Sequence, residues 1–363
     1  MCIRDRREVG LRAPLIAACA LAGLDGSDWR ATAPSGLSVP ARVPGEIVSD
    51  LHAARAIGDP LRELNFRRDA WLFDDEWTFT KRTTAARALA DGVCARAASC
   101  AEPPALFLVL ESVKMAADVR WNGQQLARST SQFVRAVLPL PPSAEADAER
   151  EDELAVSFLP SALELTRGRF MACSGGWDWA PYSPTFEGDD HTFSRGLVGS
   201  AYLLALRPGE LALSAVVPLV AWLGAEPPTA PLREGEHAGF AVCVRVFAFG
   251  ARAAGPVRGT LSATGSWGAS ASASVQLDGA ALAPPGRLLG TVELRARARD
   301  VALWWPGGMG AQPLYNLSIS FTPDAPRARE DGGVDWAPDV AGVVRATRRI
   351  VFLTAAPATP VLS

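Results

Sequence analysis

Residues Cys173–Pro181 read Cys-Ser-Gly-Gly-Trp-Asp-Trp-Ala-Pro, and this stretch places one carboxylate, Asp178, between two indoles. The paired glycines allow backbone angles that other residues resist, while Pro181 fixes its own φ and favours an extended residue before it. The stretch is therefore predicted to be a shaped loop. If its centre is extended, Trp177 and Trp179 point to one side and Asp178 points to the other.

This arrangement of side chains suits two different roles. An ionised aspartate accepts hydrogen bonds from a pair of neighbouring hydroxyls, and an indole face packs on the apolar side of a pyranose, so a sugar is the natural ligand class. Tryptophan clusters are also common in protein cores, where Asp178 would instead cap backbone N–H groups in a buried turn. The stretch taken alone leaves both interpretations open.

The same stretch resembles the Gly-Trp-Asp-Trp-Gly-Pro signature of beta-mannosidases in glycoside hydrolase family 2. Other segments resemble further blocks of that family and occur in the same order, so the resemblance spans residues 24 to about 353. These segments are Leu24-Asp25-Gly26-Ser27-Asp28-Trp29, Val43-Pro44-Gly45, Asp59-Pro60, Asn65, Trp71, Trp77, Trp304-Trp305-Pro306-Gly307, Gly310, Gln312 and Leu314-Tyr315. Three positions depart from the signature, since Ala172, Gly175 and Ala180 replace a common glutamine, aromatic residue and glycine. The departures bear on sugar affinity and leave the fold prediction intact.

The resemblance implies an all-β chain with two domains. Residues 24–207 would form a galactose-binding-like jelly-roll sandwich with a sugar-binding role, and residues 208–355 an immunoglobulin-like β-sandwich. A leader (1–23) would precede them and a short tail (356–363) would follow.

The residue pattern points the same way. Alternating apolar residues at 77–79 and 154–158 indicate half-buried strands, and the wholly apolar run 105–110 indicates a strand covered on both faces. Asn122-Gly123 predicts a hairpin turn because both residues tolerate positive φ. A second series of strands begins near Leu211, as in a sandwich, and residues 265–274 are predicted to be a weakly packed strand or a flexible loop. Residues 51–56 are predicted to form a short helical turn.

Catalysis in this family uses two glutamates of a (β/α)₈ barrel that follows the β-domains, and the acid/base residue directly follows an asparagine. The asparagines of this chain, Asn65, Asn122 and Asn316, are followed by Phe, Gly and Leu, and no stretch supplies eight strand-helix units. The resemblance therefore covers the non-catalytic front of a retaining beta-mannosidase, an enzyme that removes terminal non-reducing beta-D-mannose from glycans. We expect the barrel to be absent from this chain, no catalytic residue to lie in it, and the chain alone to be inactive. A free-standing carbohydrate-binding module and a structural or partner-binding β-protein are the alternatives.

Within this front part, the resemblance makes Asp178 the ligand of the mannose hydroxyls, with the flanking tryptophans shaping its loop. Arg169 would orient the Asp178 carboxylate or lie at the surface. Asn65 and Trp71 would line the same cleft or serve packing. Beta-mannoside glycans and the barrel are the expected partners.

Composition excludes several other classes of function. The formal net charge is −3 with signs scattered along the chain, so no basic patch suggests nucleic acid and no polybasic segment suggests a membrane anchor. His52, His191 and His237 have no second His or Cys at metal-binding spacing, and the acidic pair beside His191 is too little on its own. No glycine-rich phosphate loop is present, and we expect neither a cofactor nor a metal.

Several features suit a secretory or lysosomal route. Basic residues precede an apolar run from Ala13 to Leu24, which is the outline of a signal peptide, although acidic residues in the leader also fit a mis-annotated start. Cys94 and Cys100 lie in a segment predicted to be a loop, where they would form a disulfide or remain free thiols. Asn316-Leu317-Ser318 is an N-glycosylation sequon.

Overall fold

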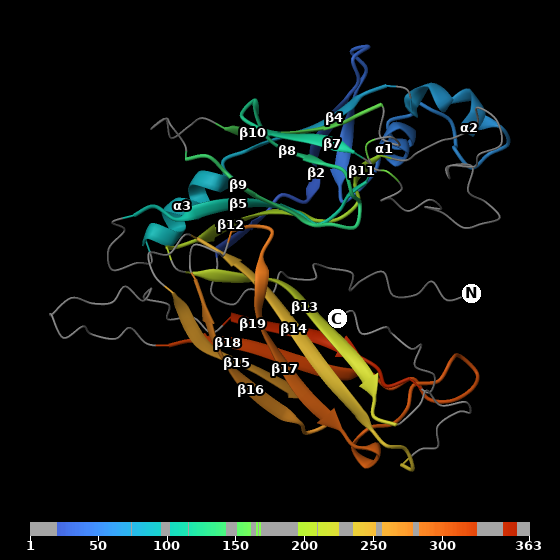
Figure 1. Ribbon diagram of the computed structural model, residues 1–363. Helices are drawn as coiled ribbons and strands as arrows, with labels where there is room; N and C mark the ends of the chain where they lie inside the picture. The colour runs from blue at the N-terminus through green and yellow to red at the C-terminus, as the bar shows by residue number, and fades with distance from the viewer. Residues whose placement is uncertain are drawn as a thin grey trace. The chain divides into compact units, whose positions relative to one another are not determined.

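A computed structural model describes residues 20–73, 75–95, 102–114, 116–142, 151–160, 165, 167, 195–208, 210–224, 235–251, 256–278, 283–324 and 344–353. These residues form two compact units, one from Ala20 to Ala205 and the other from Leu206 onward. Figure 1 shows that strands dominate both units, and the all-β prediction is confirmed. Each unit is described by itself below.

The first unit contains short helices beside its strands. Its elements in chain order are β1 (Ala20–Gly23), β2 (Gly26–Thr32), β3 (Ser38–Val43), α1 (Ile47–Ala53), α2 (Asn65–Arg68), η1 (Ala70–Phe73), β4 (Trp77–Thr83), α3 (Ala85–Ala95), β5 (Ala105–Leu110), β6 (Val113–Lys114), β7 (Ala117–Trp121), β8 (Gln124–Ser129), β9 (Ala136–Pro139), β10 (Asp152–Phe158), β11 (Gly196–Leu197) and β12 (Ala201–Leu206). Residues 20–23, which the sequence placed at the end of the leader, pair with β12 as strand β1.

Two antiparallel sheets make the jelly-roll sandwich of the first unit. One has the strand order β3-β2-β4-β10-β7-β8 and the other the order β1-β12-β5-β9, while β6 and β11 form a separate pair. The apolar faces of both sheets enclose one core. The run 105–110 is buried from Phe107 to Leu110, as its continuous apolar sequence predicted. The Asn122-Gly123 turn is also confirmed, because φ is 49° and 79° at these two residues.

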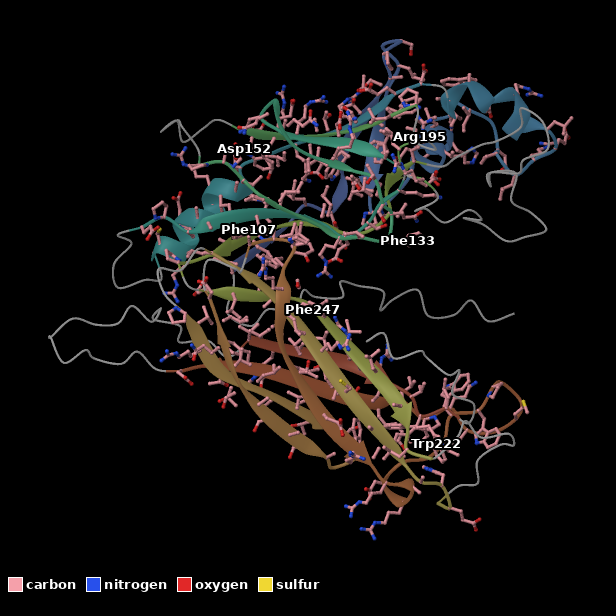
Figure 2. All side chains as sticks on the ribbon, viewed as in Figure 1. Phe107, Phe133, Asp152, Arg195, Trp222 and Phe247 are labelled. Atoms are coloured by element: carbon pink, nitrogen blue, oxygen red, sulfur yellow. The ribbon has the colours of Figure 1, made fainter. Side chains whose placement is uncertain are left out.

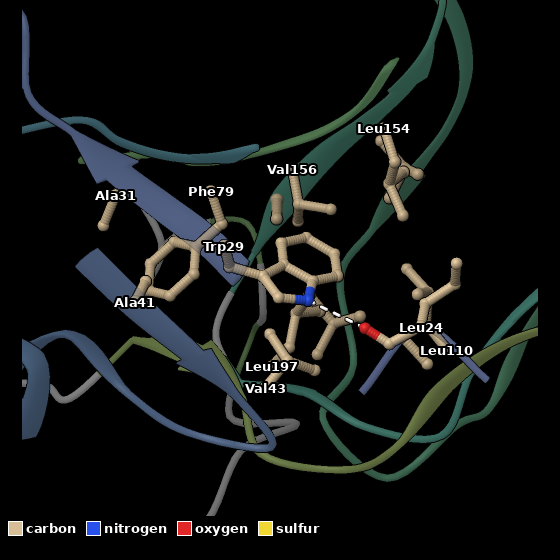
Figure 3. Close-up of a cluster of buried hydrophobic side chains, with 14 of the residues drawn as sticks. Leu24, Trp29, Ala31, Ala41, Val43, Phe79, Leu110, Leu154, Val156 and Leu197 are labelled. Atoms are coloured by element: carbon tan, nitrogen blue, oxygen red, sulfur yellow. Dashed lines mark hydrogen bonds between the residues drawn. The ribbon is translucent and has the colours of Figure 1, made fainter. Parts of the chain in front are cut away.

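Trp29 on β2 lies at the centre of this core and is 1% exposed (Figure 3). Its indole N–H donates a hydrogen bond to the carbonyl of Leu24 at 2.8 Å. Side chains from β4, β10 and β11, including Phe79, Val156 and Leu197, belong to the same cluster. Trp29 therefore anchors the block 24–29 in the core. Its indole nitrogen, the only polar atom of the ring, has a hydrogen-bond partner, as is usual for a buried tryptophan.

Helix α3 corrects the prediction that Cys94 lies in a loop. Ala86, Leu89 and Val93 are buried and recur at the three- and four-residue spacing of one helical face. The many alanines hid this pattern, because alanine favours a helix without marking which side is buried. Cys94 lies in this helix and is disulfide-bonded. Its partner is not among the described residues, so pairing with Cys100 stays a prediction.

The second unit is a sandwich of two antiparallel sheets. Its elements are β13 (Leu211–Trp222), β14 (Phe240–Gly250), β15 (Val257–Gly265), β16 (Ser270–Leu277), β17 (Arg287–Ala296), η3 (Ala298–Asp300), β18 (Tyr315–Pro323) and β19 (Val344–Ile350). The strand orders are β13-β14-β17 and β16-β15-β18-β19, which is the three-plus-four arrangement of an immunoglobulin-like domain. The strand alternative for residues 265–274 is correct from Ser270 onward, since β16 pairs with β15 along its length. Trp305, from the Trp-Trp-Pro block, packs against the core of this unit.

Candidate functional site

The predicted sugar-binding stretch lies outside the described residues, as do Arg169, Trp177, Asp178 and Trp179, so their roles stay predictions. The structure describes the chain on either side of the stretch. Before it, β10 is held between β4 and β7, and the amide of Leu159 donates to the carbonyl of Ala116 at 3.1 Å. After it, the described chain resumes at Arg195. The ends of the intervening chain are therefore attached to ordered strands.

The return point at Arg195–Leu197 is held by backbone hydrogen bonds on two sides. On one side, β11 pairs antiparallel with β6, so that Gly196 faces Lys114 and Leu197 faces Val113. On the other side, the amide of Gly45 donates to the carbonyl of Leu197, and the amide of Ile47 donates to the carbonyl of Arg195, both at 2.9 Å. The turn between β3 and α1 thus acts as a further partner of this short strand.

Gly196 has no room for a side chain. A Cβ atom at this position would lie 2.4 Å from the carbonyl oxygen of Gly45 and 2.6 Å from the Cα atom of Glu46. Both are backbone atoms, which cannot move aside as a flexible side chain could. The close approach of two backbone segments explains why glycine is needed here.

The side chain of Arg195 extends the same attachment to the start of β4. It is only 2% exposed, and its Nη1 donates to the carbonyl of Asp75, two residues before Trp77. Figure 2 labels Arg195 among the side chains of the first unit. One residue therefore contacts α1 through its backbone and the segment before β4 through its guanidinium group.

Three charged residues lie on the elements that hold this return point, namely α1 with its N-cap and β6. Glu46 caps α1 by accepting from the amides of Val48 and Ser49 at 3.2 and 2.9 Å. Lys114 is buried on β6, and the loss of water lowers its pKa, an effect that the nearby negative charge of Glu46 opposes. Asp50, one turn after Glu46 on α1, is also buried. Burying this many charged groups is costly and is uncommon away from sites with a specific role.

Asn65 and Trp71, the two other residues predicted to belong to the site, lie on α2 and η1. The Nδ2 of Asn65 donates to the carbonyl of Asp59 at 2.8 Å, so its amide closes its own loop. Trp71 is 40% exposed, and its ring lies 6.4 Å from that of the fully buried Trp77 at an angle of 47°. Trp71 thus presents part of an indole to solvent.

Sequence reasoning missed Arg195, Lys114, Glu46 and Asp50. Each is a single charged residue outside any recognisable motif of charges, and only tertiary contacts bring them together. Val43-Pro44-Gly45, one of the family-like segments, leads into the turn that receives β11, but the sequence did not show that it would meet this strand.

Metal and membrane features can be assessed over the residues that the structure describes. Within them, no group of three or more His, Cys, Asp and Glu side chains is arranged to hold a metal ion. None of the helices in the described ranges combines the length and apolar character needed to cross a membrane.

The second unit contains the predicted glycosylation site, Asn316, which is exposed on β18.

Comparison with known proteins gives a family-model match and one curated relative. Residues 29–186 match the family model described as "Glycosyl hydrolase 2 galactose-binding domain-like". A curated relative from Caenorhabditis elegans, named "Probable beta-mannosidase", is 33% identical over 92 residues. That alignment covers 25% of this chain and 9% of the relative.

Solved structures share the fold of nearly the whole chain. The beta-D-mannosidase of Dictyoglomus thermophilum matches with a TM-score of 0.54 and 18% identity, over 92% of this chain and 36% of that one. The exo-chitosanase of Amycolatopsis orientalis matches with a TM-score of 0.54 and 16% identity, over 90% of this chain and 33% of that one. The chain therefore spans about a third of these enzymes, and at such identities the likeness concerns the fold alone.

Proposed function

Because residues 29–186 match the family model of the glycosyl hydrolase 2 galactose-binding-like domain, we propose that this chain is the sugar-recognising front part of a beta-mannosidase. The observation that carries the proposal is the family match itself, which includes the whole Trp-Asp-Trp stretch. The sequence identity with a named beta-mannosidase supports mannose over other sugars.

In this proposal, Asp178 binds hydroxyl groups of a terminal beta-mannoside and takes no part in proton transfer. The anchoring of β10 and β11 supports such a role, because a binding residue on a loop is effective only when the base of the loop is held in place. The partners of the chain are beta-mannoside glycans and a (β/α)₈ barrel that supplies two catalytic glutamates for hydrolysis with retention.

The proposal predicts that residues 20–363 alone will not release the aglycone from an aryl beta-mannoside above the rate without protein. A chimera that joins the same residues to the barrel of a beta-mannosidase should release it. The experiment compares both proteins, with the parent enzyme as the control for barrel competence. Turnover by the isolated chain would show that catalytic carboxylates had been missed.

Direct binding separates this proposal from its main alternative. Isothermal titration of the isolated chain with methyl beta-mannoside should show weak or no binding, because the barrel would form most of the sugar site. Binding in the micromolar range without a barrel would favour a free-standing carbohydrate-binding module. If the chimera is folded but inactive while the parent enzyme is active, a structural role would be favoured instead.

We also propose that the protein follows a secretory route, with glycosylation of Asn316. The disulfide at Cys94 supports an oxidising compartment, and Asn316 and Ser318 are exposed two residues apart on β18, hence on one face of the sheet. The protein secreted from a eukaryotic host should lose mass on treatment with peptide N-glycosidase. Asn316→Gln and Ser318→Ala should each abolish this loss. An unglycosylated secreted protein would contradict the assignment.

A further inference from the structure

The carboxyl group of Asp50 is an unusual buried acid in the first unit. Its residue is 7% exposed, on the side of α1 that also buries Ile47 and Leu51. One oxygen, Oδ1, accepts a hydrogen bond from the amide of Arg42 at 3.2 Å. The other, Oδ2, is buried and has no hydrogen-bond partner among the described residues. If Asp50 is ionised, one hydrogen bond of 3.2 Å is the only one described that stabilises its buried charge.

The surroundings of Asp50 favour its neutral form. The loss of water raises the pKa of its carboxyl to about 7; the Arg42 amide opposes this rise, and the negative charge of Glu46 adds to it. Cations do occur on the elements packed nearby, since Lys114 lies on β6 and Arg195 precedes β11. The guanidinium group of Arg195 donates to the Asp75 carbonyl, and the ammonium group of Lys114 is attracted by the negative charge of Glu46. His52 lies on the same helix but is exposed, with Nδ1 at the carbonyl of Gly58.

Asp50, on α1, is also hydrogen-bonded to the strand end that leads into the turn that holds β11. Its bond to the Arg42 amide joins α1 to the end of β3, and the next residues of that turn supply the Gly45 and Ile47 amides that bind Leu197 and Arg195. A Cβ atom at Gly45 would lie 2.2 Å from the carbonyl oxygen of Arg42, so this turn is tightly closed. The Asp50 carboxyl group therefore contacts the same short segment of chain, residues 42–47, that supplies the two amides bound to β11 and Arg195.

We propose that Asp50 is a proton-binding group that strengthens the attachment of β11 to the β3–α1 turn when the pH falls. Protonation removes a buried charge that one backbone amide offsets in part, and it leaves Oδ1 able to accept from the Arg42 amide. Ionisation brings the charge back beside Glu46 and loosens the turn. The inference does not depend on the proposed function, because it concerns the folded chain with or without a sugar ligand.

The sign of the pH dependence follows from the pKa values of the folded and unfolded states. The pKa of Asp50 is about 7 when folded, against 3.8 as the ordinary value. Between these values the folded protein holds a proton that the unfolded chain has released, so stability falls as the pH rises and levels off above about 7. One such proton changes the folding equilibrium constant by about tenfold per pH unit in the steepest part of this range.

The first test compares the wild type with Asp50→Asn, which keeps the shape and an acceptor for the Arg42 amide. Chemical denaturation gives the folding equilibrium constant of each protein at both pH values. The ratio of the variant's constant to that of the wild type should rise at least about tenfold from pH 5 to pH 8. Asp59→Asn is the matched control, because Asp59 is an exposed acid that also accepts one backbone amide, from Leu61. Its effect should be the same at both pH values. An equal effect of Asp50→Asn at both would overturn the proposal.

The second test follows the attachment of β11 itself and does not require Asp50→Asn to fold. In the wild-type chain, hydrogen exchange corrected for intrinsic rates should show weaker protection of the Gly45 and Ile47 amides at pH 8 than at pH 5. The carboxyl carbon of Asp50 should titrate over the same range by nuclear magnetic resonance, and Glu46→Gln should move that titration to lower pH. Protection that does not change with pH, or an Asp50 that titrates below pH 5, would refute the inference.

Discussion

Replacing Trp77 with alanine should lower the free energy of unfolding of the first unit by about 3–5 kcal/mol. Trp77 is fully buried on β4, and its indole N–H donates to the carbonyl of Leu72 at 2.7 Å. The change would leave a large cavity and remove the donor to that carbonyl. This loss is a large share of the total stability of an ordinary domain, so the variant should be partly unfolded at physiological temperature.

Trp71→Ala is the matched control, because the two tryptophans lie six positions apart in the same block and only Trp77 is buried. Trp71 is 40% exposed, so its replacement should cost about 1 kcal/mol or less. Urea denaturation followed by far-ultraviolet circular dichroism measures both variants without relying on tryptophan fluorescence. Equal losses for the two would mean that Trp71 is as much a core residue as Trp77.

Replacing Asp178 with alanine should lower kcat/KM for a beta-mannoside by about ten- to a few-hundredfold in the chimera with a barrel. The resemblance places this carboxylate against hydroxyls of the sugar, and a charge-assisted hydrogen bond contributes about 1.5–3 kcal/mol. The loss would be larger if these hydrogen bonds tighten in the transition state.

The pH profile of the same variant separates binding from proton transfer. Its shape should match that of the parent chimera, because the two barrel glutamates determine the ionisation limbs. A pH–rate series with a mannoside and the matching glucoside tests this on both proteins. An unchanged kcat/KM would remove Asp178 from the site, and the loss of one limb would make it an acid or base.

The architecture of the chain could be predicted from local signals. Alternation along strands such as β4 and β10, the continuous apolar run of β5 and the Asn122-Gly123 turn each follow from a rule that acts over a few residues. Helix α3 was missed for a local reason too, since its alanines carry little periodic contrast. The family resemblance supplied the order of the two sandwiches, which periodicity alone does not determine.

Residue identity also marked the candidate binding stretch, because an acid between two indoles is chemically distinctive wherever it lies. What the sequence could not show is how the chain is fixed where it returns from that stretch. Arg195, Gly196 and Glu46 acquire their environments from segments about 150 residues apart, through the contacts of β11 and Arg195 with α1 and its preceding turn. Burial of a charge and the space left for a side chain are properties of such long-range contacts. They depend on which backbone segments meet, and only the tertiary structure decided that.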